Sequence, residues 1–218
     1  MIKAIFFDYG GVLVVPATKY IYEELTKKGK VVEEEKLREV LWNEEVLSGP
    51  KGTLDLLLKT KYKELKLSSK EIITFFGKIP KQKKVWDIAH ELKEKKISIA
   101  LISDHIAEVV EMIRKDKEFQ DLFERAIFST EAKCSKNSKG IFDKAAEMAD
   151  ASPNELLLID DHESVIDRAK NYGWQAILFK NPTDARNDYI TVFSEQSSDK
   201  YLEILERFLD KHLKPDKN

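Results

Sequence analysis

The sequence predicts an α/β fold: a parallel sheet core flanked by helices, with an all-helical segment inserted after the first strand. Short apolar runs lack the alternation of a half-exposed sheet, helical patterns separate the later runs, and residues 16–80 contain helical patterns alone. Strands that alternate with helices imply right-handed crossovers, and therefore a parallel sheet covered on both faces.

We expect strands at the apolar runs, which are residues 2–7, 97–102, 156–159 and 176–179, with a weaker run at 126–128. Apolar residues three and four apart indicate helices before and after the second run, at Val85, Ile88, Ala89 and Leu92 and at Val109, Val110 and Ile113. A further stripe at Leu202, Leu205, Leu209 and Leu213 predicts a packing helix near the end of the sequence.

The inserted segment is bounded by prolines. Pro16 ends the first apolar stretch, and Pro80 precedes the helix that leads to the second strand. Helical stripes fill the interval, at Leu37, Val40 and Leu41 and at Leu54, Leu58, Tyr62 and Leu65, and Ser68 followed by Glu71 reads as a helix start. We expect a core domain of residues 1–15 and 81–218, with residues 16–80 forming a helical cap above the sheet.

Composition excludes several classes of protein. The 218 residues include 37 Lys+Arg against 39 Asp+Glu, and this formal charge of −2 gives no electrostatic reason to expect a nucleic-acid partner. One cysteine, Cys134, excludes an intramolecular disulfide and a cysteine-based zinc cluster, and favours a reducing compartment. Asp8 comes too early for a signal-peptide core, and no later run approaches the ~20 residues of a membrane span. We expect a cytoplasmic protein without a membrane partner, of undetermined oligomeric state.

Acidic residues end three of the predicted strands. Asp8 follows the first, Ser103 and Asp104 the second, and Asp160 and Asp161 the fourth. Ligands of an open parallel sheet bind at the carboxyl ends of its strands, so these side chains are expected to converge. A buried carboxylate must be paired or bound to a cation, and oxygen ligands suit Mg²⁺. The pattern therefore predicts a magnesium site at this edge of the sheet.

With these motifs the chain resembles the haloacid dehalogenase-like (HAD) hydrolases that carry a helical cap after motif one. The four motifs occur in order, as residues 6–13 (FFDYGGVL), 99–103 (IALIS), 135–137 (SKN, then GIF at 140–142) and 158–161 (LIDD). The resemblance covers essentially the whole chain and implies a Rossmann-like core.

The resemblance implies a Mg²⁺-dependent reaction at Asp8. Asp8 would be the nucleophile that forms an aspartyl-phosphate. The metal ligands would be one oxygen of Asp8, the backbone carbonyl of Gly10 and Asp161, with Asp160 beside them through a metal-bound water. Gly10 and Gly11 would form a tight turn whose amides approach the phosphate.

Three further residues are implied to bind the substrate phosphate. Ser103 would donate a hydrogen bond to it, and Asp104 follows in the same loop. Lys136 would hold the phosphate and the nucleophile together through its charge. Ile141 and Phe142 fix the register that selects Lys136 among the nearby lysines, although Asn137 stands where the family usually has proline.

One position departs from the usual family pattern. Most phosphatases of this family have a second aspartate two residues after the nucleophile, which protonates the leaving alcohol, whereas this chain has Gly10. Losing a positioned acid or base costs about 10²–10⁴-fold in rate. Asp104, His105 or His162 could replace it, although the simpler interpretation of both histidines is that they are loop residues tuned by their neighbours.

The predicted function is a Mg²⁺-dependent phosphomonoesterase acting on a small phosphorylated metabolite. Two alternatives stay open: a metal-independent 2-haloacid dehalogenase, and a non-catalytic protein that binds a phosphorylated ligand, which Gly10 favours. In the cap, Trp42, Tyr20 and Tyr22 are candidates for substrate contact, although aromatic residues at helical spacing are more often core.

Overall fold

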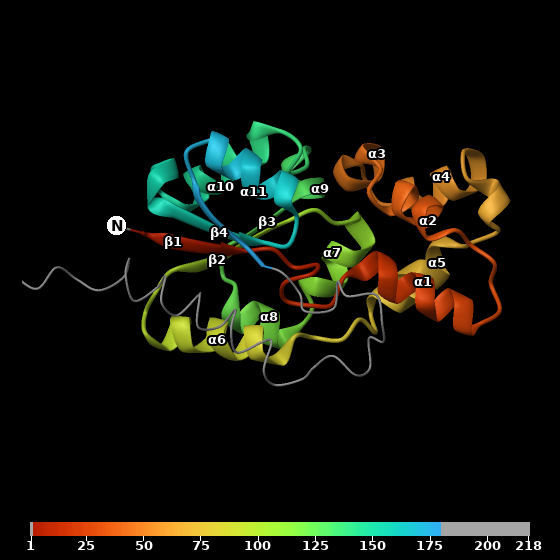
Figure 1. Ribbon diagram of the computed structural model, residues 1–218, viewed down its shortest axis with the longest axis horizontal. Helices are drawn as coiled ribbons and strands as arrows, with labels where there is room; N and C mark the ends of the chain where they lie inside the picture. Colours follow the sequence, from red (N-terminus) through yellow and green to blue (C-terminus); the bar gives the residue numbers. More distant parts are fainter. Residues whose placement is uncertain (1, 180–218) are drawn as a thin grey trace, which may run out of the picture.

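The computed structural model describes residues 2–179 and contains a five-stranded parallel sheet with strand order β3-β2-β1-β4-β5 (Figure 1). The strands are β1 (Ala4–Phe7), β2 (Ile99–Ser103), β3 (Ala126–Phe128), β4 (Leu156–Asp160) and β5 (Gln175–Leu178). Each lies at one of the five predicted runs, so the predicted fold class is confirmed. The chain leaves β1 towards β2 and later returns to β4 on its other side, and this reversal is where ligands bind in such sheets.

Helices cover both faces of the sheet. In Figure 1, α9 (Ser129–Ala132), α10 (Lys139–Ala149) and α11 (Glu163–Asn171) lie on one face, and α6 (Lys83–Glu94) and α8 (Lys117–Leu122) on the other. Successive strand residues point to opposite faces. Ile5 and Phe7 accordingly belong to the apolar cluster that includes α6, α8 and α7 (Ala107–Ile113), whereas Ala4 and Phe6 belong to the cluster that includes α10 and α11.

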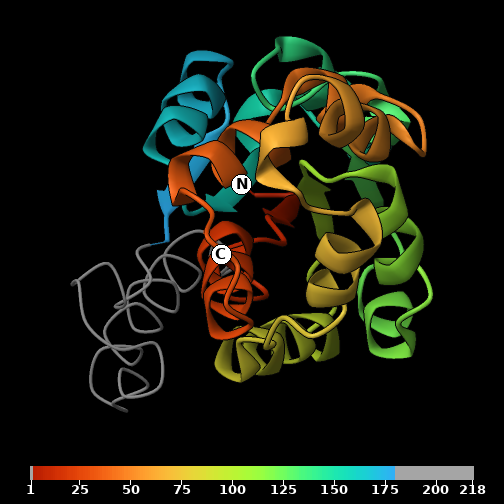
Figure 2. The same cartoon turned by 90° about the vertical axis from the view of Figure 1, so that its right-hand side faces the viewer.

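The predicted insertion is helical, and it follows β1 as α1 (Ala17–Lys27), α2 (Glu34–Leu41), α3 (Glu44–Ser48), α4 (Thr53–Thr60), a 3-10 turn (Lys63–Leu65) and α5 (Ser69–Phe76). Ser68 caps α5 by accepting a hydrogen bond from the Glu71 amide at 3.2 Å. The stripe from Leu54 to Leu65 is buried and spans two elements, because α4 ends at Thr60 and Leu65 lies in the 3-10 turn. Figure 2 shows these helices (the cap) in front of the sheet.

The chain enters and leaves the cap at one place. The Val15 amide donates to the Pro80 carbonyl at 3.1 Å, and the Gln82 amide donates to the Leu13 carbonyl at 2.8 Å. Val14 and Lys81 form an isolated antiparallel bridge between the two segments. The entry and exit segments are therefore hydrogen-bonded neighbours beside the turn that follows β1.

Within residues 2–179, no helix has both the length and the apolar character needed to cross a membrane. The stripe at Leu202, Leu205, Leu209 and Leu213 lies outside the described residues.

Candidate active site

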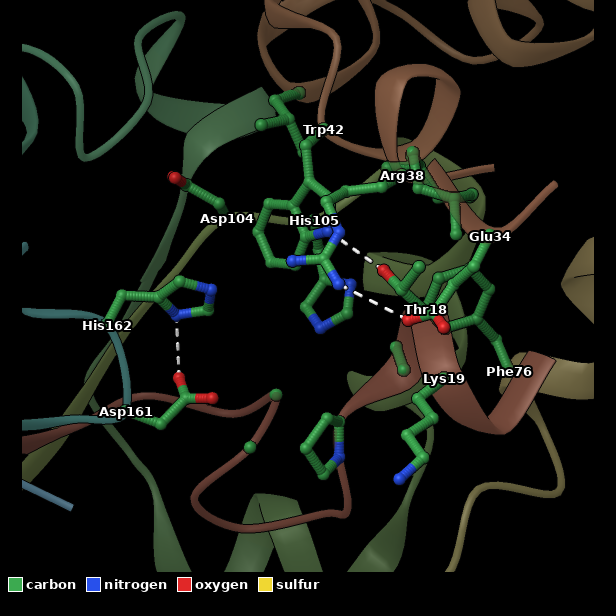
Figure 3. A pocket seen from close by; sticks show the side chains of 17 residues that line it. Thr18, Lys19, Glu34, Arg38, Trp42, Phe76, Asp104, His105, Asp161 and His162 are labelled. Carbon is green, nitrogen blue, oxygen red and sulfur yellow. Dashed lines mark hydrogen bonds and ion pairs between the residues drawn. The ribbon is translucent and has the colours of Figure 1, made fainter. Parts of the chain in front are cut away.

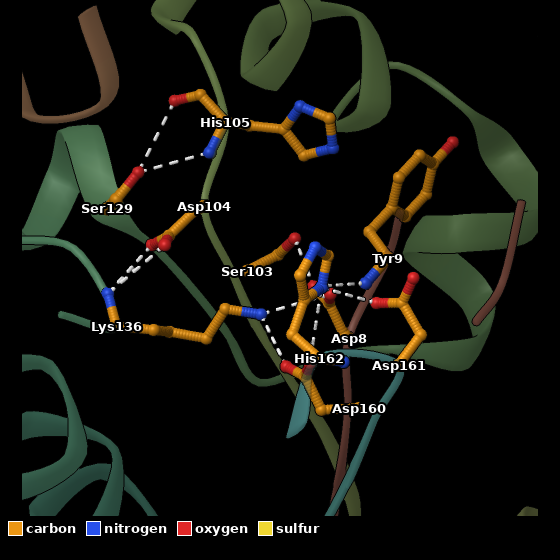
Figure 4. Close-up of polar contacts among 10 residues, drawn as sticks. All are labelled: Asp8, Tyr9, Ser103, Asp104, His105, Ser129, Lys136, Asp160, Asp161 and His162. Atoms are coloured by element: carbon orange, nitrogen blue, oxygen red, sulfur yellow. Dashed lines mark hydrogen bonds and ion pairs between the residues drawn. The ribbon is translucent and has the colours of Figure 1, made fainter. Parts of the chain in front are cut away.

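The predicted site residues meet at the carboxyl ends of β1, β2 and β4 (Figure 4). Ser103 Oγ donates to Asp8 Oδ1 at 2.6 Å, and the Tyr9 amide donates to the same oxygen at 2.7 Å. Lys136 reaches in from the loop between α9 and α10, and its Nζ lies 3.0 Å from Asp8 Oδ2 and 2.6 Å from Asp160 Oδ2. One lysine thus bridges the carboxylates that follow or end two neighbouring strands.

These charges are held away from water. The side chains of Asp8 and Lys136 are 3% exposed and that of Asp160 is fully buried. Burial raises the pKa of Asp8 to about 7, even though the charge of Lys136 opposes the shift. Burial also acts to raise the pKa of Asp160, but Lys136 and His162 outweigh it and lower that pKa to about 2. The pKa of Lys136 is raised because Asp160 and Asp8 outweigh its burial.

Asp8, Asp160, Asp161 and His162 form a group whose ligand atoms lie within 4.8 Å of one another. His162 Nδ1 lies 2.8 Å from Asp161 Oδ1, and hydrogen bonds to Asp160 and Asp161 raise the pKa of His162 to about 10. The three carboxylates of this group are the hard oxygen donors that suit a divalent cation such as Mg²⁺. The donor set therefore fits the predicted metal. Asp160 Oδ1 also accepts from the His162 amide at 2.9 Å, which holds the turn before α11.

The turn after β1 carries Gly10 and Gly11 and is held by the start of α6. Gln82 Nε2 donates to the carbonyl oxygens of Gly11, Val12 and Val14 at 2.8, 2.9 and 3.2 Å. Gly11 has a φ of +79°, a backbone conformation that favours glycine, and a Cβ there would stand 2.0 Å from Asp161 Oδ2. A Cβ at Gly10 would meet nothing within 4 Å in the described part of the chain. The two glycines therefore have different structural roles. Gly11 avoids a clash with the Asp161 side chain, whereas Gly10 leaves space unfilled at the edge of the cavity.

Substituting each glycine by alanine tests this difference. We expect Gly11→Ala to lower the free energy of unfolding by at least about 1 kcal/mol, because the left-handed φ and the clash with Asp161 both oppose a methyl group. Gly10→Ala is the matched control and should stay within about 0.5 kcal/mol of the parent protein. Urea denaturation measures both, and equal losses for the two variants would contradict the assignment.

The carboxylate of Asp104 is bound to the loop that carries Lys136. Its carboxylate oxygens accept from the backbone amide of Lys136 at 3.0 and 3.2 Å, and burial raises its pKa to about 6 against the charge of Lys136. The side chain therefore anchors the loop that carries the lysine. Asp104 also lines the cavity beside the acidic strand ends, and its contact with a substrate phosphate stays a prediction.

A cavity of about 340 Å³ opens between these residues and the cap (Figure 3). On the core side it is lined by Gly10, Gly11, Asp104, His105, Ile106, Asp161 and His162. On the cap side it is lined by Pro16, Ala17, Thr18, Lys19, Glu34, Arg38, Leu41, Trp42, Leu47 and Phe76. The cap thus supplies both apolar and charged groups to a space that begins at the acidic strand ends.

The histidines and cap aromatics separate into distinct roles. His105 is a buried loop residue whose ring packs edge-on against Tyr9 and Phe76, and burial lowers its pKa to about 3. Its Nε2 has no hydrogen-bond partner among the described residues. Trp42 is not core: it lines the cavity, donates to Thr18 Oγ1 at 2.9 Å and lies 5.5 Å from the His162 ring.

Tyr20 and Tyr22 pack against the core cluster, as the ordinary interpretation of helical aromatics expects. Sequence reasoning missed Gln82 and Arg38, because a polar residue in a helical pattern reads as solvated surface. Only their position beside the turn and the cavity identifies them.

Comparison with protein-family models matches residues 2–173 to the haloacid dehalogenase-like hydrolases. A comparison with curated proteins gave no match.

Several solved structures share the fold. A HAD family enzyme, BT-2542 from Bacteroides thetaiotaomicron, in an aspartate-to-alanine variant bound to magnesium and inorganic phosphate, is 25% identical over 88% of this chain and 100% of its own, with a TM-score of 0.66. A predicted HAD-like family hydrolase from Porphyromonas gingivalis is 16% identical over 96% of this chain and 98% of its own, with a TM-score of 0.70. L-2-haloacid dehalogenase from Xanthobacter autotrophicus, with chloropropionic acid covalently bound, is 16% identical over 81% of this chain and 76% of its own, with a TM-score of 0.61.

Proposed function

The chain belongs to the haloacid dehalogenase-like hydrolases, and from this premise we propose that it is a Mg²⁺-dependent phosphomonoesterase acting on a small phosphorylated metabolite. The observation that supports this most is the position of Lys136, whose Nζ lies 3.0 Å from Asp8 and 2.6 Å from Asp160 beside a third carboxylate, Asp161. A nucleophilic carboxylate beside a fixed cation and a hard-metal donor set is an arrangement suited to phosphoryl transfer.

In this mechanism a carboxylate oxygen of Asp8 attacks the phosphorus atom. The bond between phosphorus and the leaving-group oxygen breaks as the aspartyl-phosphate forms, and the departing alkoxide takes a proton from water. A water molecule then attacks the phosphorus of the intermediate and gives up a proton to solvent, and the bond to Asp8 breaks to release phosphate and restore the carboxylate. Ser103 and the Tyr9 amide, both bonded to Asp8 Oδ1, orient the nucleophile for this attack. Lys136 contributes the positive charge that attracts the phosphate dianion.

The carboxylates of Asp8 and Asp161 would hold the metal together with the carbonyl of Gly10, with Asp160 beside them through a metal-bound water. When bound, Mg²⁺ supplies positive charge that offsets the repulsion between Asp8 and the incoming phosphate and stabilises the transferring group. His162 Nδ1 lies 2.8 Å from Asp161 Oδ1, so the imidazole stands beside the carboxylates that would hold the metal.

Metal removal is the direct test of this proposal. We expect EDTA to lower the release of phosphate by at least about 100-fold, because the metal contributes several kcal/mol to stabilising the transferring group, and added Mg²⁺ should restore it. The assay is phosphate release from a panel of sugar phosphates, nucleotides and small phosphorylated acids.

Two results would favour the alternative functions. Chloride release from 2-chloropropionate that is insensitive to EDTA would identify a dehalogenase, consistent with the fold that the Xanthobacter enzyme shares. Binding of inorganic phosphate without turnover on any member of the panel would identify a non-catalytic phosphate-binding protein.

We further propose that residues 16–80 act as a cap that closes over the site, with residues 1–15 and 81–218 as the core domain. The cavity lining supports this, because cap and core residues share it. Closure would exclude water and large substrates. The lone cysteine favours the cytoplasm as the location of the activity.

A further inference from the structure

We propose that Glu44 is a positioning residue that couples the closed cap to the placement of Lys136; this inference rests on the proposed function of the site. Glu44 begins the cap helix α3, and its carboxylate crosses to the loop between α9 and α10. Glu44 Oε2 accepts from Ser135 Oγ at 2.7 Å and from Asn137 Nδ2 at 3.3 Å, and Oε1 accepts from the Ser135 amide at 3.3 Å. All three donors belong to the residues on either side of Lys136.

The loop around Lys136 is held from two directions. The core holds the lysine itself, since its backbone amide donates to Asp104 at 3.0 and 3.2 Å. The cap holds its neighbours through Glu44. Glu44 is solvent-exposed overall, but its hydrogen-bond partner Ser135 is fully buried. Ser135 Oγ also accepts from the Asn137 amide at 3.2 Å, so the contact reaches the whole turn.

Two further polar contacts between the cap and the core lie away from this loop. Gly52 donates to Glu108 Oε1 at 2.8 Å and Lys51 lies 2.7 Å from Glu111 Oε2, which ties the cap to α7. Opening the cap at α3 would therefore remove the three Glu44 hydrogen bonds together and leave the Lys136 loop held by Asp104. The lysine side chain must meet both Asp8 and Asp160 within 3.0 Å, so a small shift of the loop would disturb the phosphate site.

The chain segment that carries Glu44 also contributes to the cavity lining through Trp42. Trp42, two residues before Glu44, lines the cavity and lies 5.5 Å from the ring of His162, whereas Glu44 is not among the lining residues. A substrate that packs against Trp42 would stabilise the closed position of this segment, and with it the contact of Glu44 to the lysine loop. Substrate binding at Trp42 and the correct placement of Lys136 are thereby linked, although Glu44 does not contact the substrate.

The test is the affinity for inorganic phosphate in the presence of Mg²⁺, measured by calorimetry on the full chain. We expect Glu44→Ala to weaken phosphate binding about tenfold. Removing a negative charge near the site would by itself strengthen the binding of an anion, so the expected sign separates positioning from simple electrostatics. Glu45→Ala is the matched control, because it removes the same charge from the same helix at a residue with no hydrogen bond to the lysine loop in the described chain. It should change the affinity by less than about twofold.

A double-variant cycle distinguishes positioning from general destabilisation. In a Lys136→Met background the additional Glu44→Ala change should alter phosphate affinity by less than about twofold, because the group being positioned is gone. Ser135→Ala, which removes the hydroxyl donor from the other side, should weaken phosphate binding in the same direction as Glu44→Ala. The fitted stoichiometry reports the folded fraction of each variant, so a variant that fails to fold is recognised and the other carries the test.

The outcomes separate this inference from the proposed function. Unchanged or tighter phosphate binding by Glu44→Ala and Ser135→Ala, with normal turnover by the parent protein, would overturn the coupling alone. An equal loss in the parent and Lys136→Met backgrounds would also overturn it. A parent protein that neither binds phosphate nor releases it from any substrate would overturn the proposed function, and this inference with it.

Discussion

Replacing Asp8 by Asn is expected to abolish the proposed phosphatase activity, with kcat reduced by roughly 10⁴–10⁶-fold, the scale on which loss of a covalent nucleophile acts. Asparagine keeps the shape of the side chain and an oxygen that can accept from Ser103 and the Tyr9 amide. It lacks the anionic oxygen that attacks phosphorus. Release of p-nitrophenol from p-nitrophenyl phosphate with saturating Mg²⁺ measures the change.

The folded state should survive this substitution. Burial raises the pKa of Asp8 to about 7, which means that the carboxylate is costly to ionise where it lies, and a neutral amide avoids that cost. We expect the thermal midpoint of the metal-free variant to equal or exceed that of the parent protein. The matched control is Asp167→Asn, the same change at an exposed carboxylate on α11, which should keep full activity. Activity that survives Asp8→Asn would refute the mechanism.

Installing an acid at Gly10 should increase the rate. A side chain at this position enters open space at the edge of the cavity, and the backbone there is not in the left-handed region. Gly10→Asp would supply the proton donor that most phosphatases of this family have two residues after the nucleophile. A positioned acid or base is worth about 10²–10⁴-fold, and we expect kcat for alkyl phosphates to rise by at least about 100-fold.

Two comparisons make this result interpretable. p-Nitrophenyl phosphate releases a stabilised phenolate that needs no proton, so its kcat should change by no more than about threefold. Gly10→Asn fills the same space without a titratable group and should leave the rate on alkyl phosphates near that of the parent protein. Equal gains from Asp and Asn, or no gain from Asp, would contradict this prediction and direct the search to another proton donor. His162, which lines the same cavity, would then be the first residue to substitute.

The fold was predictable because buried parallel strands are recognisable in the sequence as uninterrupted apolar runs. Runs such as residues 156–159 are apolar throughout because β4 is covered on both faces, and the helices between strands bury one stripe each. The convergence of Asp8, Ser103 and Asp160 was predictable for the same reason, since parallel strands end at one edge. Lys136 was harder to select, and only its spacing to Ile141 and Phe142 singled it out among nearby lysines.

What the sequence could not provide was the direction of individual polar side chains. Asp104 ends a strand as the other acids do, yet its carboxylate faces the Lys136 amide. Glu44 lies 91 residues before Ser135, and nothing local marks a glutamate at a helix start as a contact across that distance. Trp42 has helical neighbours on both sides, so its sequence position is typical of a core aromatic residue. In the structure it lines the cavity instead. Such contacts depend on how the insertion sits on the sheet, which no local pattern encodes.

The hydrogen-bonded entry and exit of the cap make the insertion an exchangeable module. Residues 13–15 and 80–82 already lie side by side, so the chain passes between core and cap through two adjacent segments, and contacts such as that of Glu44 with Ser135 join the two elsewhere. Closing a longer loop between fixed ends costs only about 0.6 kcal/mol for each doubling of its length. Caps of other sizes could therefore be spliced between these segments with little penalty to the core, provided that Gln82 is kept to hold the glycine turn. Such an exchange would change the cap side of the cavity while the acidic strand ends stay in place, and the contact of Glu44 with the lysine loop is the link that a new cap would have to restore.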